Sequence, residues 1–152
     1  MAHAGCGCSG SMARVIERNE ATENETTVKA ASELRQWPVQ LHLVPPTAPW
    51  FQDSDILIAA DCVAFALGSF HSDLLKGKAL AIACPKLDDT APYVEKLAAI
   101  FQKNEVKSIT VAIMEVPCCR GLDVMVRQAL AKSGKEIPLE TAVIGINGER
   151  RN

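Results

Sequence analysis

The chain has 152 residues, of which 48 % are hydrophobic and 22 % are charged, values that suit one ordinary globular domain with a real core. Its net charge of −2 comes without a basic run, which argues against nucleic acid as a partner. No apolar run reaches the roughly 18 residues that span a bilayer, and residues 1–10 lack a signal-peptide pattern, so we expect a cytoplasmic protein with no membrane partner.

The first 36 residues are predicted to form a cysteine-bearing N-terminal arm and polar linker, followed by a domain over residues 37–152. Residues 1–10 are small and glycine-rich, and they carry His3, Cys6 and Cys8. Ser11 is a candidate N-cap for a short helix over 12–17. The polar, acidic run that follows is typical of a solvated linker. We expect the arm to become ordered only where its cysteines meet a ligand.

Strands alternate with helices in the remainder of the chain. The expected strands cover 39–44, 55–60, 79–83, 108–114 and 141–146. The expected helices cover 91–103 and 119–132, and residues 63–76 are expected to form one helix or two short ones. This alternation predicts an α/β fold: an open, mostly parallel sheet of about five strands with helices on both faces, flavodoxin-like or Rossmann-like. The sequence has neither a G-x-G-x-x-G after its first strand nor a P-loop, so no motif supports nucleotide binding.

Cysteines follow three of the expected strands. Cys62 comes after 55–60, Cys84 after 79–83, and the adjacent pair Cys118 and Cys119 after 108–114. In an open parallel sheet the carboxyl ends of the strands share one edge, and ligands bind there. The sequence therefore predicts a cluster of thiols at this edge. In a cytoplasmic protein such thiols are reduced, metal-bound or catalytic, so the six cysteines do not indicate a disulfide framework.

An iron–sulfur cluster, most simply [4Fe–4S], is the cofactor that these thiols favour, because such clusters are held by converging thiolates, usually four. The candidate ligands are Cys6, Cys8, Cys62, Cys84, Cys118 and Cys119. Three come from the strand ends, with one of the two adjacent cysteines used, and Cys8 is the expected fourth. Arg120 and the amides of the following helix are expected to offset the negative charge of the cluster. Asp61 is a further candidate, as a hydrogen-bond acceptor or an oxygen ligand.

Two other uses of the cysteines remain open. Zinc is one, although the cysteines lack the paired C-x2–4-C spacing of structural zinc sites. The other is thiol–disulfide or persulfide chemistry by Cys118 and Cys119, whose pKa a helix N-terminus is expected to lower. Against this second use, redox pairs are usually spaced C-x-x-C. Each cysteine taken alone is most simply a small core residue, and His71 is expected to face solvent.

Four segments resemble one module of a known group of proteins. They are LRQWPVQLHLVPP (34–46), ILIAADCVAFALGSFH (56–71), KALAIACPKLDD (78–89) and MEVPCCRGL (114–122). They resemble the C-terminal module, matched here over residues 34–148, of uncharacterised anaerobe proteins described as ferredoxin-type iron–sulfur binding proteins. CSGS (8–11) is similar to a C-P-G-S element of that group. This sequence has no C-x-x-C-x-x-C run, so only the module's own cysteines, Cys8 among them, are carried over.

The resemblance implies an iron–sulfur protein of an anaerobic redox system. With four protein thiolates the cluster would serve electron transfer. With three, one iron would stay open for chemistry on a small molecule, so the sequence leaves open whether the protein is an enzyme. The expected partner is a redox protein such as a ferredoxin or an oxidoreductase, and a homo-oligomer is possible.

Overall fold

The computed structural model describes residues 14–18 and 29–152 of the chain. The four strands are β1 (Ser54–Ala60), β2 (Lys78–Ala83), β3 (Val106–Met114) and β4 (Leu139–Ile144). The helices are η2 (Pro49–Phe51), α1 (Val63–Ala66), η3 (Phe70–Leu75), α2 (Tyr93–Lys103), η4 (Pro117–Cys119) and α3 (Arg120–Ser133). The Cys6 and Cys8 predictions lie outside the described residues.

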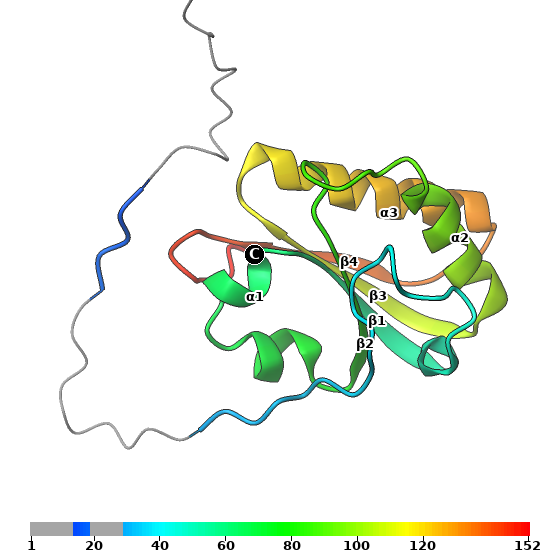
Figure 1. Ribbon diagram of the computed structural model, residues 1–152, viewed down its shortest axis with the longest axis horizontal. Coiled ribbons are helices and arrows are strands. Elements are labelled where there is room, and N and C mark those ends of the chain that lie inside the picture. Colours follow the sequence, from blue (N-terminus) through cyan, green and yellow to red (C-terminus); the bar gives the residue numbers. More distant parts are fainter. Residues whose placement is uncertain (1–13, 19–28) are drawn as a thin grey trace, which may run out of the picture.

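All strand pairs in the sheet are parallel, and the strand order is β2-β1-β3-β4. Helices α2 and α3 cover one face of the sheet, and α1 with η3 lies on the other (Figure 1). The predicted open parallel α/β fold with helices on both faces is therefore confirmed. Its two middle strands are almost continuously buried, as is typical of a parallel sheet covered on both sides.

The expected strand at residues 39–44 is wrong, so the described part of the chain has four strands instead of about five. Only Gln40 pairs with the sheet, through a single parallel bridge to Ile82. The chain then turns at once, because the amides of Leu43 and Val44 both donate to the Gln40 carbonyl. Two prolines, which cannot donate to a strand ladder, come directly afterwards.

Of the two alternatives for residues 63–76, the structure has two short helices. The four-residue α1 is followed by η3, which is a π-helix. Helices α2 and α3 are confirmed, and α3 ends at Gly134, whose φ of 70° is the left-handed conformation favoured at helix C-termini. Residues 14–18 are not helical. Within the described ranges, no helix is both long enough and apolar enough to cross a membrane.

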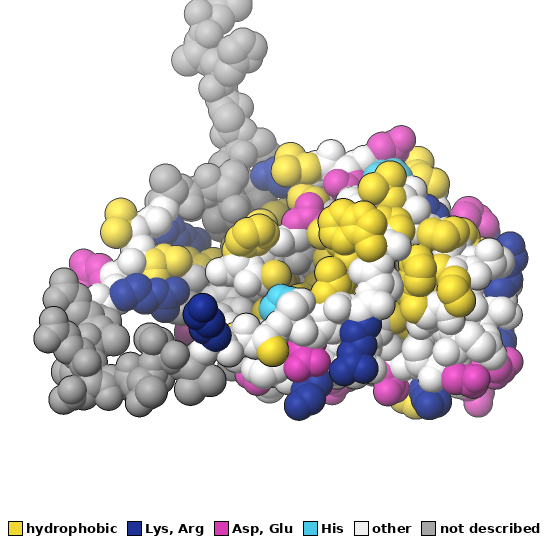
Figure 2. Space-filling view, turned by 60° about the horizontal axis from the view of Figure 1, so that its bottom comes forward, with side chains coloured by type: hydrophobic (Ala, Val, Ile, Leu, Met, Phe, Trp, Pro, Cys, Tyr) yellow, Lys and Arg dark blue, Asp and Glu magenta, His cyan; other side chains and the backbone are white. Residues whose placement is uncertain are grey.

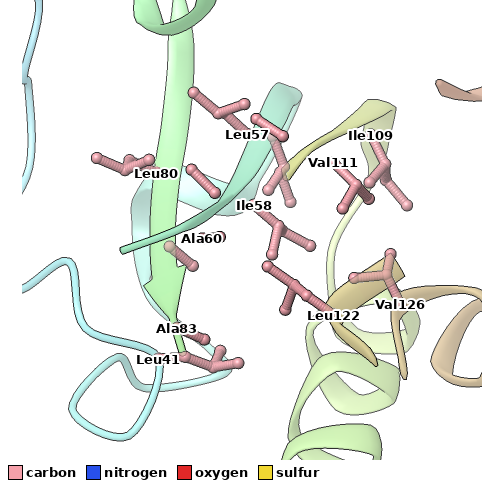
Figure 3. Close-up of a cluster of buried hydrophobic side chains, with 14 of the residues drawn as sticks. Leu41, Leu57, Ile58, Ala60, Leu80, Ala83, Ile109, Val111, Leu122 and Val126 are labelled. Carbon is pink, nitrogen blue, oxygen red and sulfur yellow. The ribbon is translucent and has the colours of Figure 1, made fainter. Parts of the chain in front are cut away.

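The core fills the space between the sheet and α2 and α3. Leu122 and Val126 of α3 lie beside Ile58 and Val111 of the middle strands (Figure 3), and all four are at most 1 % exposed. Truncating a residue such as Leu122 to alanine would cost about 2–5 kcal/mol. This packing fixes α3 against β3, and so it fixes the turn between them that carries the adjacent cysteines.

The C-terminal segment is held to the end of β3 by Glu115. Its Oε1 accepts a hydrogen bond from the Ile146 amide at 3.1 Å, and its Oε2 accepts one from Arg151 Nε at 3.1 Å. The Ile146 amide, and then the charge of Arg151, lower the pKa of Glu115 below its ordinary 4.5. A carboxyl with a lowered pKa stabilises the fold above its unfolded pKa, and loses that contribution as the pH falls through its folded pKa.

We therefore expect Glu115→Gln to lower the melting temperature at pH 7 and to have a smaller effect at pH 3. As the pH falls toward the folded pKa, the wild-type carboxyl takes up protons and loses its stabilising contribution, so the difference between the two proteins shrinks. Thermal unfolding followed by circular dichroism at both pH values measures the difference. An equal difference at both values would contradict the role of the Glu115 charge.

Candidate functional site at the carboxyl edge of the sheet

The strand order creates a switch point between β1 and β3. The chain passes from β1 to its neighbour β2 on one side, then crosses back to β3 on the other. In open α/β sheets the crevice at the carboxyl ends of two such strands is where ligands bind. Cys62 lies two residues after β1, and the turn with Cys118 and Cys119 follows β3. Three cysteines thus flank the switch point.

The loop after β2 also reaches this point. A Cβ atom added to Gly121, in the first turn of α3, would lie 3.3 Å from Pro85 Cβ, so the backbone there is in close contact with the residue after Cys84. In addition, the amide of Asp61 donates to the Ala83 carbonyl at 3.1 Å. The loops that follow β1, β2 and β3 are therefore packed together at one edge, as the spacing of the cysteines predicted.

Asp88 closes the loop that carries Cys84. Its Oδ2 accepts hydrogen bonds from the Cys84 amide at 2.9 Å, from Gln40 Nε2 at 3.1 Å and from the Tyr93 hydroxyl, and its own amide donates to the Cys84 carbonyl at 3.0 Å. Burial raises the pKa of Asp88, but the bonds from Tyr93, Cys84 and Gln40 outweigh it, so the pKa is lowered. A charged Asp88 therefore fixes the backbone at Cys84.

The four described cysteines are all free thiols: Cys62 is exposed, Cys84 and Cys118 are half-buried, and Cys119 is buried. Burial, and then the charges of Cys84, Asp61 and Cys118, raise the pKa of Cys62. Ionised groups influence one another in this way only when they are close. The electrostatics thus agree with the packing that Cys62, Cys84 and Cys118 gather at one edge.

Cys119 behaves differently from the prediction. We expected the start of a helix to lower its pKa, but burial in the core, reinforced by the charges of Cys118 and Cys62, raises it to about 11. The cost of removing a thiolate from water exceeds the lowering effect of the hydrogen bond with the Met114 backbone. Cys119 is therefore a poor nucleophile at neutral pH.

The described residues contain no group of three His, Cys, Asp or Glu side chains placed to hold a metal ion. A single zinc ion needs its ligands about 2.3 Å from the metal, and so about 3.8 Å from one another. Arg120 is exposed, and forms no salt bridge with another described residue. Asp61 Oδ1 is buried without a hydrogen-bond partner in the part of the chain that the structure describes.

Sequence reasoning missed the residues that hold the edge together. Asp88, Tyr93 and Gln40 were treated as loop, helix and strand residues, and their meeting joins three separate segments. Asp88, four residues after Cys84 in a turn, was the available signal, since aspartate side chains commonly bond to nearby backbone amides. The contact of Gly121 with Pro85 has no comparable local signal.

The fold and its edge define a Rossmann-like α/β domain. The chain belongs to the Rossmann-like domain family, which matches residues 48–151. An uncharacterised protein from Archaeoglobus fulgidus is 35 % identical over 116 residues, which cover 76 % of this chain and 81 % of the relative. No solved structure matches. Neither name mentions a ligand or an activity, so the resemblance to ferredoxin-type iron–sulfur proteins stays a prediction.

We expect Gly121→Val to lower the free energy of unfolding by about 1–3 kcal/mol, because its methyl groups would push against Pro85. Urea unfolding measures the loss. Gly68→Val is the matched control, since a Cβ at Gly68 meets nothing within 4 Å. Equal losses in the two variants would show that the contact of α3 with the Cys84 loop is not tight.

In metal-free protein, we expect iodoacetamide to label Cys119 last of the four described cysteines, because it is buried and its pKa is raised. A pKa of about 11, against an ordinary 9.0, leaves Cys119 with roughly one hundredth of the usual thiolate at pH 8. Peptide mass spectrometry over time gives the order. Labelling of Cys119 should accelerate up to pH 11, and rapid labelling of Cys119 at pH 7 would contradict its assignment as a buried, protonated thiol.

Proposed function

We propose that this protein binds an iron–sulfur cluster, most simply [4Fe–4S], at the carboxyl edge of its sheet. The observation that supports it is the packing of three strand-end loops, which carry Cys62, Cys84 and Cys118, at the switch point. Thiolates are soft ligands that suit iron–sulfur clusters. Cys119 is a member of the hydrophobic core, so Cys118 is the better ligand of the adjacent pair.

The spacing of the cysteines in the sequence favours a cluster over zinc. Structural zinc sites use paired C-x2–4-C spacing, which Cys62, Cys84 and Cys118 lack.

Cys8 is the proposed fourth ligand, and it lies outside the described residues. Two observations support a position of the nearest described segment near this edge. Arg18 Nη1 donates to the Asn147 carbonyl at 2.7 Å, and the charge of Arg14 contributes to the lowered pKa of Glu115. Figure 1 shows this segment beside the turn that follows β4. Five residues lie between Cys8 and Arg14, so this stretch of chain spans at most about 20 Å.

The start of α3 offers the cluster electrostatic support. The positive end of the dipole of this 14-residue helix lies at the cysteine turn, because the helix begins directly after Cys119. Arg120 adds a formal charge at the same place. When bound, the cluster would supply one-electron transfer, and the residues of this chain would hold it and tune its potential. We propose an anaerobic redox role with a ferredoxin or an oxidoreductase as partner.

Metal-free thiol chemistry by Cys118 and Cys119 has less support. A resolving pair needs two thiols that ionise near neutral pH, and the pKa of Cys119 is about 11. Binding a metal would deprotonate such a thiol, but a disulfide partner would not.

Protein purified without air should absorb broadly in the visible and contain iron and sulfide in equal amounts. Cys62→Ser and Cys84→Ser should each remove most of the iron, because each takes away one thiolate ligand. Cys119→Ser and Cys6→Ser are the matched controls and should retain it, whereas Cys8→Ser should lose it. Iron, sulfide and zinc analysis of the five variants gives the result. Colourless protein with one zinc, or full iron content in the Cys62 and Cys84 variants, would refute the proposal.

A further inference from the structure

A second feature lies on the opposite face of the sheet from α2 and α3. A pocket of about 240 Å³ opens between the sheet, α1, η3 and the segment around Leu34 and Val39. Its volume is just below the range of about 300–1,000 Å³ for drug-sized ligands, so it suits a molecule built on roughly one ring. Figure 2 brings this underside of Figure 1 forward, and hydrophobic side chains gather on it. No cysteine lines the pocket, which separates it from the thiol edge.

One wall of the pocket is the π-helix η3. Phe70, His71 and Leu75 of this helix line the pocket. π-Helical turns are rare in proteins and occur frequently at functional sites. The wall is held in place before any ligand arrives, because His71 Nδ1 accepts a hydrogen bond from the Glu33 amide at 3.0 Å. His71 was expected to face solvent, and the structure instead places it between η3 and the segment that contains Glu33.

Asp61 is the polar group that stands out in this apolar pocket. It lines the pocket at the end of β1, and its Oδ1 is buried without a hydrogen-bond partner among the described residues. A buried polar atom that is left unpaired costs free energy, and such an atom in a folded protein calls for an explanation. A ligand that donates a hydrogen bond at this position would remove the cost.

The charge of the surroundings selects the kind of donor. The pocket is lined by no lysine or arginine. Burial, and then the charge of Asp88, raise the pKa of Asp61, so a positive charge bound beside this carboxylate would stabilise its ionised form. A cationic donor therefore fits, and an anion of the same shape does not. Phe65, which is 92 % exposed although it lines the pocket, offers a ring against which an apolar body can pack.

We infer that this pocket binds a small, mostly apolar amine, whose N–H group donates to Asp61 Oδ1. The body of the amine would lie among the side chains of the sheet and η3. Asp61 directly precedes Cys62 in the sequence, so the pocket would hold an organic molecule beside the proposed cluster. The pocket is lined by no cysteine, and Asp61 is its one residue that the sequence also offered as a candidate oxygen ligand of the cluster.

The test uses two fluorinated probes of one shape and opposite charge, 4-fluorobenzylamine and 4-fluorobenzoate. Fluorine NMR of each probe, titrated with the full chain purified without air, gives the two dissociation constants. We expect the amine to bind about tenfold more tightly than the carboxylate, which corresponds to about 1.4 kcal/mol. Asp61→Asn should remove this preference.

Two further variants locate the binding. Ala64→Phe places a ring into the pocket from the exposed side of α1, and it should weaken binding of the amine at least about tenfold. Ala91→Phe, at an exposed position before α2, is the matched control and should leave binding unchanged. The inference is overturned if the wild type binds neither probe or shows no preference, or if Ala64→Phe binds like the wild type. Iron and sulfide measured in the same samples report separately on the cluster.

Discussion

The parallel pairing of β1 with both β2 and β3 is the constraint on which the rest of this structure depends. Because the register pairs Ala60 with Ala83 and Ala59 with Ala112, the three strands end almost level with one another. The residues that follow them must then share one edge. Burial of both faces by helices keeps this register, since a shift of one residue would turn apolar side chains to the wrong face.

The edge is assembled by interactions of different kinds. Asp88 binds the loop after β2 through directed hydrogen bonds from Cys84, Gln40 and Tyr93, whereas α3 reaches the same loop by close packing at Gly121. One is polar and depends on charge, and the other depends on the absence of a side chain. Together they position the thiols that follow separate strands.

The two faces of the sheet serve different purposes. The face under α2 and α3 is a tightly packed core, in which Leu122 and Val126 fill the space over the middle strands (Figure 3). The other face has a short α1, a π-helix and a pocket. Cys62 and Asp61, adjacent in the sequence, lie where the two environments meet. The proposed cluster and the proposed amine would therefore occupy neighbouring places with different chemistry.

The sequence by itself determined the four strands and the helices α2 and α3, because hydrophobic periodicity is a local signal. It also determined that the loops with Cys62, Cys84 and Cys118 share one edge, because the carboxyl ends of parallel strands always do. The tertiary structure decided those features that local patterns and general topology rules cannot predict. It turned the chain away after Gln40, formed two short helices after β1, the second of them the π-helix η3, and buried Cys119 so that its pKa rises to about 11. Each of these outcomes depends on contacts between segments far apart in the chain.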